Sequence, residues 1–230
     1  MQVIPGLHQI TLRCVNIFLI VEDTLTLIDT GFRGSGKHIA RYIKNMGRSV
    51  DEIGQIIVTH NHLDHVGGLP ELKRMAPQAS VALHEADLNP DNSQLPYPRL
   101  VLMALKLPLA SLYRPLVYAR LEDIDIKLAG GETLSPLDGL QVIATPGHTT
   151  GGISLYSPSK KVLFVGDMLN NRHRDLIPPD RFISLNYPEA VESVKKLAQL
   201  DFDVLCCGHG RPIVGNAGDY VRQWIKRRGL

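Results

Sequence analysis

Four potential metal ligands lie within six residues, in the segment HNHLDH at 60–65. His60 and His62 are two positions apart, so in an extended chain both side chains project to the same side. Asp64 and His65 follow at a turn that leads into a helix, where they can face a second ion close by. Neutral imidazole and carboxylate groups bind Zn²⁺, Fe²⁺ or Mn²⁺. The segment therefore indicates a metal site.

Three further candidate ligands share the same local context. His148 lies in TPGHTTGG at 145–152, Asp167 ends the apolar run VLFVGD, and His209 lies in CCGHG. Each follows an apolar run and has a neighbouring glycine, which lets the backbone approach an ion closely. Sheets in α/β proteins place their chemistry where strands stop. We therefore expect these residues to join the cluster at 60–65.

The elements that must position these residues are predicted from the apolar runs and their breaks. Strands are expected at 7–13, 15–21, 25–29, 53–59, 80–84, 124–128, 140–145, 153–157, 161–165 and 203–207. Helices are expected at 35–46, up to about 75, at 190–200 and at 218–228, with Ser35 as the N-cap of the first. Strands and helices thus occur in both halves of the chain.

The motifs HNHLDHVGG, GHTTGG, LFVGD and CCGHG resemble, in this order, the motif series of the metallo-β-lactamase superfamily. LTLIDTG at 25–31 resembles its opening motif, and the resemblance extends from about residue 7 to 214. It implies an α/β fold, a four-layer αββα sandwich with two mixed β-sheets face to face, helices outside and metals at one edge. We expect a single domain over 1–230 with a helical insertion at about 89–120.

The resemblance also implies how the ligands are shared between two divalent ions: His60, His62 and His148 at site 1, Asp64, His65 and His209 at site 2, and Asp167 bridging them. It implies a structural role for Asp29. An acidic bridge is typical of the glyoxalase II-like branch and of lactone hydrolases, whereas true β-lactamases generally lack it. Asp167 therefore argues against β-lactamase activity.

Two such ions, with zinc the first expectation and iron or manganese the alternatives, lower the pKa of a shared water to roughly neutral. The predicted activity is that of a binuclear metallohydrolase of the carboxylic-ester or thioester type, in which a metal-bridging hydroxide cleaves an ester-like acyl bond. Asp64 has two candidate roles, as a plain ligand and as a proton shuttle to the leaving group.

The substrate stays open between a thioester and a lactone. The chain is short for the C-terminal helical domain of classical glyoxalase II. Position 170 is Asn170, where acyl-homoserine lactonases are expected to have tyrosine.

Two other activities resemble this motif set. A persulfide dioxygenase would use a single iron at the equivalents of His60, His148 and Asp167. A phosphodiesterase or nuclease of the superfamily would often carry a further domain or an RNA-binding arm. The basic segment at 222–228 spans one short helix, which is typical of a solvated face.

Composition favours a cytoplasmic protein with a small-molecule substrate. The formal net charge is +2, which argues against a nucleic-acid or membrane partner. Three cysteines, two of them adjacent, make a poor disulfide framework. The apolar segment at 89–120 has three candidate roles: packing on the domain, a lid over the metals, or a homodimer contact.

Overall fold

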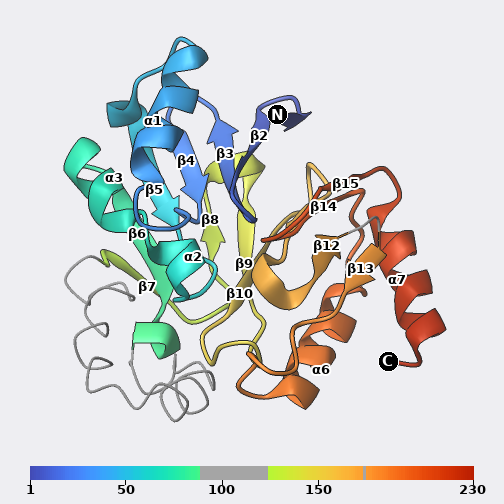
Figure 1. The fold of residues 1–230 in the computed structure, drawn as a ribbon. Helices are drawn as coiled ribbons and strands as arrows, with labels where there is room; N and C mark the ends of the chain where they lie inside the picture. Colours follow the sequence, from blue (N-terminus) through green and yellow to red (C-terminus); the bar gives the residue numbers. More distant parts are fainter. Residues whose placement is uncertain (89–123, 173–174) are drawn as a thin grey trace, which may run out of the picture.

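The computed structural model describes residues 1–88, 124–172 and 175–230. The expected helical insertion at about 89–120 and His173 lie outside the described residues. Element labels follow Figure 1.

The first half of the chain forms a mixed sheet with the strand order β1-β2-β3-β4-β5-β6-β7. The pairs from β1 to β4 are antiparallel, and the pairs from β4 to β7 are parallel. Its strands are β1 Gln2–Ile4, β2 Leu7–Leu12, β3 Val15–Val21, β4 Leu25–Ile28, β5 Ile53–Ile57, β6 Ser80–His84 and β7 Ile126–Leu128.

The second half forms a mixed sheet with the order β15-β14-β11-β10-β9-β8, in which the pair β11–β14 is parallel. Its strands are β8 Thr133–Leu134, β9 Leu140–Ala144, β10 Ile153–Ser157, β11 Val162–Phe164, β14 Val204–Cys206 and β15 Ile213–Val214. A separate antiparallel hairpin is made by β12 Asn170–Arg172 and β13 Asp175–Ile177.

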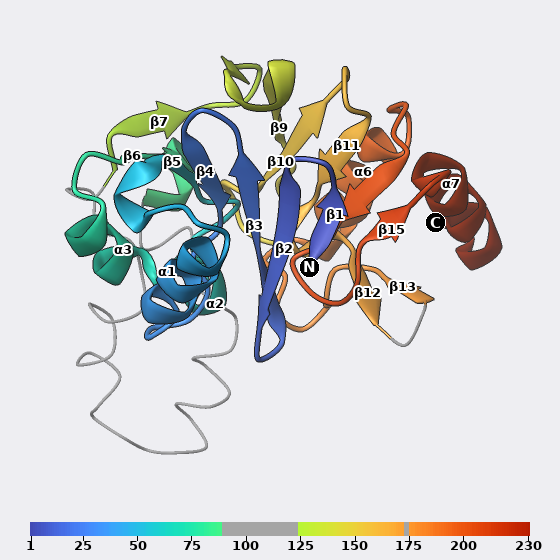
Figure 2. The same cartoon turned by 90° about the horizontal axis from the view of Figure 1, so that it is seen from above.

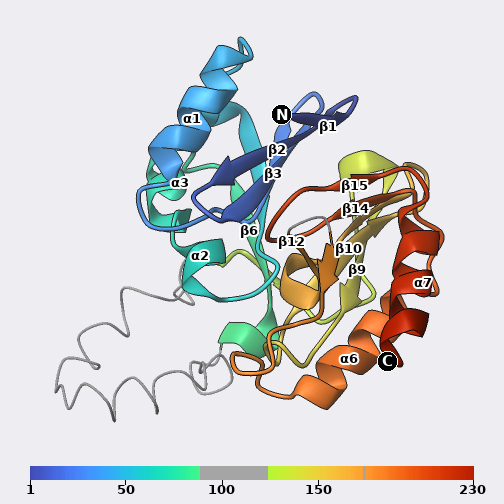
Figure 3. The same ribbon diagram turned by 45° about the vertical axis from the view of Figure 1, so that its right-hand side comes forward.

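Helices cover the outer faces of both sheets (Figures 1 and 2). The α-helices are α1 Gly36–Asn45, α2 Leu63–Val66, α3 Leu69–Met75, α6 Tyr187–Leu197 and α7 Ala217–Arg228. Short 3₁₀ helices are η1 Val50–Glu52, η2 Glu85–Leu88, η4 Pro136–Asp138 and η5 Gly166–Met168. In Figure 3, α1 and α3 lie beside the first sheet, and α6 and α7 lie beside the second.

Three apolar layers hold this arrangement together. In β3, Ile17 and Leu19 pack with α1 and α3, whereas Phe18 and Ile20 pack in the cluster shared with the second sheet. Successive side chains of a strand point to opposite faces, so a strand buried on both faces is apolar throughout. A third cluster joins the second sheet to α6 and α7. The expected αββα sandwich is confirmed.

The predicted strands and helices in the described residues are confirmed in type, with ends that differ by at most three residues. The predicted strand at 53–59 ends at Ile57. Ser35 precedes α1 as expected, but its side chain makes no capping hydrogen bond. The segment at 170–180 contains β12 and β13.

The strands that the sequence did not predict are β1, β8, β12, β13 and β15, each of two or three residues. Such lengths are too short for a period-two pattern to be recognised. None of the helices in the described parts of the chain has the length and hydropathy needed to span a bilayer.

The contact between the sheets predicts a large effect of truncating Phe164. This side chain is 1% exposed, and its ring packs edge-on against Phe18 with 5.3 Å between centroids. Phe164→Ala should lower the free energy of unfolding by about 3–5 kcal/mol, measured by urea denaturation. Val214→Ala, at a position 57% exposed, is the control and should change it by less than about 0.5 kcal/mol. A loss below about 1 kcal/mol for Phe164→Ala would contradict this packing.

Candidate metal centre

The seven candidate ligands come together where strands of both sheets end. His60 and His62 follow β5, and Asp64 and His65 lie in α2. The others come from the second half of the chain: His148 between β9 and β10, Asp167 in η5 after β11, and His209 after β14. The ligand atoms form three overlapping groups, in each of which they lie within 4.8 Å of one another.

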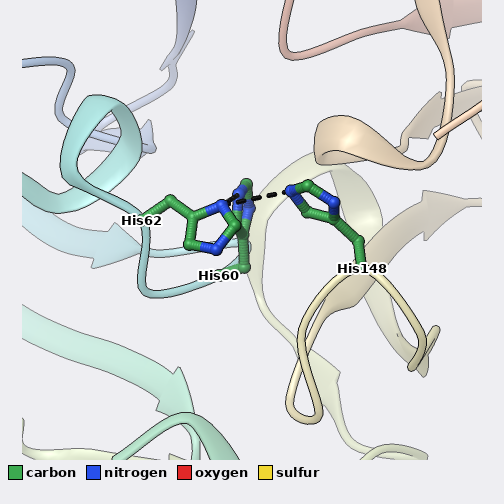
Figure 4. A group of neighbouring side chains, drawn as sticks. All are labelled: His60, His62 and His148. Atoms are coloured by element: carbon green, nitrogen blue, oxygen red, sulfur yellow. Dashed lines mark hydrogen bonds between the residues drawn. The ribbon is translucent and has the colours of Figure 1, made fainter. Parts of the chain in front are cut away.

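The first group consists of His60, His62 and His148. His62 Nδ1 lies 3.1 Å from His60 Nε2 and 3.1 Å from His148 Nε2. In Figure 4 the three rings converge from two facing loops. All three side chains are at most 5% exposed, so the three ring nitrogens lie close together and are shielded from solvent.

The second group consists of Asp64, His65 and His209. Asp64 Oδ2 lies 3.4 Å from His209 Nε2 and 3.7 Å from His65 Nε2. The Asp64 side chain is 24% exposed, and it lines the neighbouring cavity. Asp64 is therefore the member of the cluster most accessible from the cavity.

The third group consists of His60, His65 and Asp167, and Asp167 lies between the first and second groups. Its Oδ1 is 3.3 Å from His65 Nε2 and 3.2 Å from His209 Nε2, while its Oδ2 is 3.6 Å from His148 Nε2. One carboxylate thus presents one oxygen to each group.

Four of the imidazoles are held from behind through Nδ1. His60 Nδ1 pairs with Thr59 Oγ1 at 3.1 Å, and His148 Nδ1 pairs with Ser184 Oγ at 3.3 Å. His209 Nδ1 donates to the Cys14 carbonyl at 2.6 Å. A partner on one ring nitrogen fixes the ring orientation and the tautomer. The Nε2 atoms are consequently directed at the centre of the cluster.

Asp29 supports the cluster, as expected, and holds the fourth of these rings. Its Oδ2 lies 2.8 Å from His65 Nδ1, and its Oδ1 accepts the Thr59 backbone N–H at 2.8 Å. Thr59 in turn contacts His60. Asp29 thus positions His65 of the second group directly and His60 of the first group through Thr59. Asp29 has φ +63°, a left-handed conformation that is uncommon outside glycine.

Electrostatics distinguish the two groups. Burial, with mutual repulsion among the imidazoles, lowers the pKa of His60 well below its usual range and that of His62 to about 3. Burial also lowers the pKa of His148. These rings stay neutral near pH 7, the form in which imidazole binds a metal.

In the second group, burial alone would lower the pKa of both imidazoles, but carboxylates reverse the sign. Asp29 and Asp167 raise the pKa of His65 well above its usual value, and the neighbouring carboxylates of Asp167 and Asp64 raise that of His209 to about 10. Burial opposes ionisation of Asp167, yet His65 and His209 hold its pKa well below the usual range. The negative charge of these carboxylates raises the pKa of both imidazoles, and the same charge would attract a divalent cation.

Two buried polar atoms without a hydrogen-bond partner indicate which kind of ligand the cluster fits. Within the described residues, His65 Nε2 and Asp167 Oδ1 have no hydrogen-bond partner, although they face each other. Buried polar atoms are rarely left unsatisfied. Together with the three converging nitrogens of the first group, they form a nitrogen and oxygen donor set that fits divalent metal ions.

A cavity of about 850 Å³ opens onto this cluster. Asp64, His148, Asp167 and His209 form part of its lining. Residues between Asn170 and Asp180 form another part of its wall, which continues to Phe182 and Tyr187. Sequence analysis missed Cys14, which lines the cavity and orients His209. Cys14 acts on His209 through its backbone carbonyl, so its side-chain type could not have revealed this role.

The other histidines and cysteines considered stand apart. In the described chain, His8, His38 and His84 join none of the three groups. Cys206 and Cys207 are fully buried, and burial raises the pKa of both thiols. They are small core residues.

The model of the metallo-beta-lactamase superfamily matches residues 10–209. The chain therefore belongs to this superfamily of metallo-hydrolases, whose members use metal ions.

Individual relatives are more distant. A probable metallo-hydrolase of Bacillus subtilis, YflN, is 28% identical over 228 residues, which cover 91% of this chain and 86% of the relative. A hydroxyacylglutathione hydrolase of Rhodopseudomonas palustris is 31% identical over 161 residues, which cover 69% of this chain and 49% of that enzyme.

The fold is shared with a solved metallo-beta-lactamase family protein of Thermus thermophilus. The TM-score is 0.74 at 24% identity, over 98% of this chain and 78% of that chain.

Gly208 is predicted to be essential for metal binding. A Cβ at this position would lie 2.5 Å from Asp167 Oδ1 and 2.9 Å from His65 Cε1. Gly208→Ala should displace both and lower zinc affinity about tenfold or more, measured by titration with a chromophoric chelator. Gly54→Ala is the matched control, because its Cβ would make an ordinary contact at 3.4 Å with Thr24. Unchanged affinity in Gly208→Ala would disprove this packing constraint.

Proposed function

We propose that this protein is a hydrolase that binds two divalent metal ions and cleaves an ester-like acyl bond, a thioester or a lactone, in a small molecule. Zinc is the first candidate metal. His60, His62 and His148 would hold one ion, Asp64, His65 and His209 would hold the other, and Asp167 would contact both.

The position of Asp167 is the observation that carries the proposal. Its two oxygens face different groups, at 3.6 Å from His148 Nε2 and 3.2 Å from His209 Nε2. A carboxylate has two oxygens with several lone pairs, so it can serve two cations at once.

Bound divalent cations would lower the pKa of water and polarise a carbonyl oxygen. The chain itself supplies the route for the proton. Both carboxylates line the cavity, but the Asp64 side chain is 24% exposed and Asp167 only 8%. Asp64 would accept a proton from the attacking water and return it to the leaving sulfur or oxygen atom as the acyl bond breaks. We thus assign it both candidate roles, ligand and proton carrier.

The cavity supports a small substrate with an apolar portion. Phe182 and Tyr187 line it together with Ile177, and two guanidinium groups, Arg172 and Arg181, lie in the same lining. A volume of about 850 Å³ is in the range of small-molecule sites. The similarity to hydroxyacylglutathione hydrolases also supports acyl chemistry.

The decisive test is a substrate panel combined with elemental analysis of protein purified without added metal. Thioesters, lactones and phosphodiesters should be compared at equal concentration. We expect two metal ions per chain and turnover of a thioester or a lactone. One iron per chain with oxygen uptake on glutathione persulfide would replace the proposal with a dioxygenase, and turnover confined to phosphodiesters would replace it with a phosphodiesterase.

Asp167→Ala should lower the content of both metals and abolish turnover while the fold survives. The variant removes the carboxylate between the two groups, and circular dichroism together with elemental analysis would separate folding from metal loss. A fully metallated, fully active variant would refute the bridging role.

Asp64→Asn should separate the two roles of Asp64. The amide keeps one oxygen for a metal but cannot carry the proton, so kcat should fall about 100-fold or more while most of the metal stays bound. Metal content and kcat would be measured on the same samples. Asp138→Asn, at a side chain 66% exposed and paired with Lys160, is the control. Loss of metal in proportion to activity would leave Asp64 as a plain ligand.

A further inference from the structure

Asp87 is a fully buried carboxylate outside the ligand cluster. It lies in η2, directly after β6, and its side chain has no exposure to solvent. An isolated charge in such a place is unfavourable unless hydrogen bonds compensate for the lost water. The partners of Asp87 therefore indicate what it is used for.

Three donors surround this carboxylate. The Asn61 backbone N–H donates to Oδ2 at 3.0 Å, and the Thr149 hydroxyl donates to the same oxygen at 2.9 Å. The Gly151 backbone N–H donates to Oδ1 at 2.6 Å. The Asn61 side chain adds a fourth link, through Nδ2 to the Asp87 carbonyl at 2.9 Å.

These donors belong to the two loops that form the first ligand group. Asn61 stands between His60 and His62, in the loop after β5 of the first sheet. Thr149 and Gly151 follow His148, in the loop between β9 and β10 of the second sheet. Asp87 thus joins the two loops at a position behind their histidines.

The approach of Gly151 is as close as the backbone permits. A Cβ on Gly151 would lie 2.6 Å from the Asp87 nitrogen and 2.8 Å from Oδ1. Glycine at this position is what allows the loop of the second sheet to reach the carboxylate.

We propose that Asp87 is a positioning residue that sets the separation of His60 and His62 from His148, and thereby the affinity and geometry of the first metal site. This inference rests on the proposed metal site, but it is independent of which bond the enzyme cleaves. His60 and His62 follow a strand of the first sheet, and His148 lies in a loop of the second sheet. Hydrogen-bonded links join these segments besides the apolar core: the Ile153 backbone N–H donates to the Thr59 carbonyl at 2.9 Å, and the Asp87 carboxylate accepts from both loops. Of these two, Asp87 contacts the residue between His60 and His62 and also the residues that follow His148.

Asp87→Asn is the informative variant because it keeps the shape of the side chain. Its amide nitrogen replaces one acceptor, so at least one of the two backbone N–H groups loses its partner. We expect the affinity for Co²⁺ to fall about 10- to 100-fold and the visible absorption bands of the Co²⁺-loaded protein to shift. Zn²⁺ competition would measure the same change with the other metal.

Thr149→Val tests the same clamp by a smaller change, the loss of a single hydroxyl donor. Its effect on Co²⁺ affinity should be weaker than that of Asp87→Asn, and the double variant should be less than additive because both changes act on one contact. Thr149→Val also decides the question if Asp87→Asn does not fold: wild-type affinity and absorption bands in Thr149→Val would then overturn the proposal.

Asp125→Asn is the matched control. Asp125 Oδ2 accepts the Val81 backbone N–H at 2.9 Å, so it supports the region of β6 from a position away from the ligand loops. Its variant should lower the melting temperature without altering Co²⁺ affinity or absorption. If Asp87→Asn behaves in the same way, Asp87 has only a structural role and the proposal is wrong. Wild-type protein that binds no metal would instead overturn the proposed function.

Discussion

Five imidazoles and two carboxylates share a space almost closed to water, and the rest of the structure depends on keeping them there. Ring nitrogens 3.1 Å apart repel one another whenever more than one of them is protonated. The arrangement persists because the rings of the first group are neutral and those of the second group are matched by acids. Four of the five rings have a partner on Nδ1, and these partners hold them in this arrangement.

Contacts between distant segments provide much of that hold. His209 from the second half of the chain donates to the Cys14 carbonyl beside β3, and His65 is paired with Asp29 at the end of β4. Asp87 adds a link between loops of the two sheets. Each contact fixes a ring or a loop that carries a ring, so orientation is set before any ion arrives.

The roles of the four carboxylates differ with their burial. Asp29 and Asp87 lie inside the protein and position other groups, whereas Asp167 occupies the space between the two ligand groups. Asp64 alone among the four is substantially exposed to the cavity. The same chemical group thus serves as a support and as the proposed shared ligand and proton carrier, and its greater exposure sets Asp64 apart from the other three.

The sequence alone determined the ligand types, their spacing and the alternation of apolar strands and helices. HNHLDH and the glycine-flanked His148, Asp167 and His209 therefore led to both the fold and the candidate cluster. Short strands such as β8 and β15, the cavity wall at Phe182 and Tyr187, and the clamp at Asp87 were decided only by tertiary structure. They depend on backbone groups and on contacts between residues far apart in the chain, such as Asp87 and Gly151, which are 64 positions apart. Local sequence patterns show which side chains are present, but they do not show which distant donor will form a hydrogen bond with them.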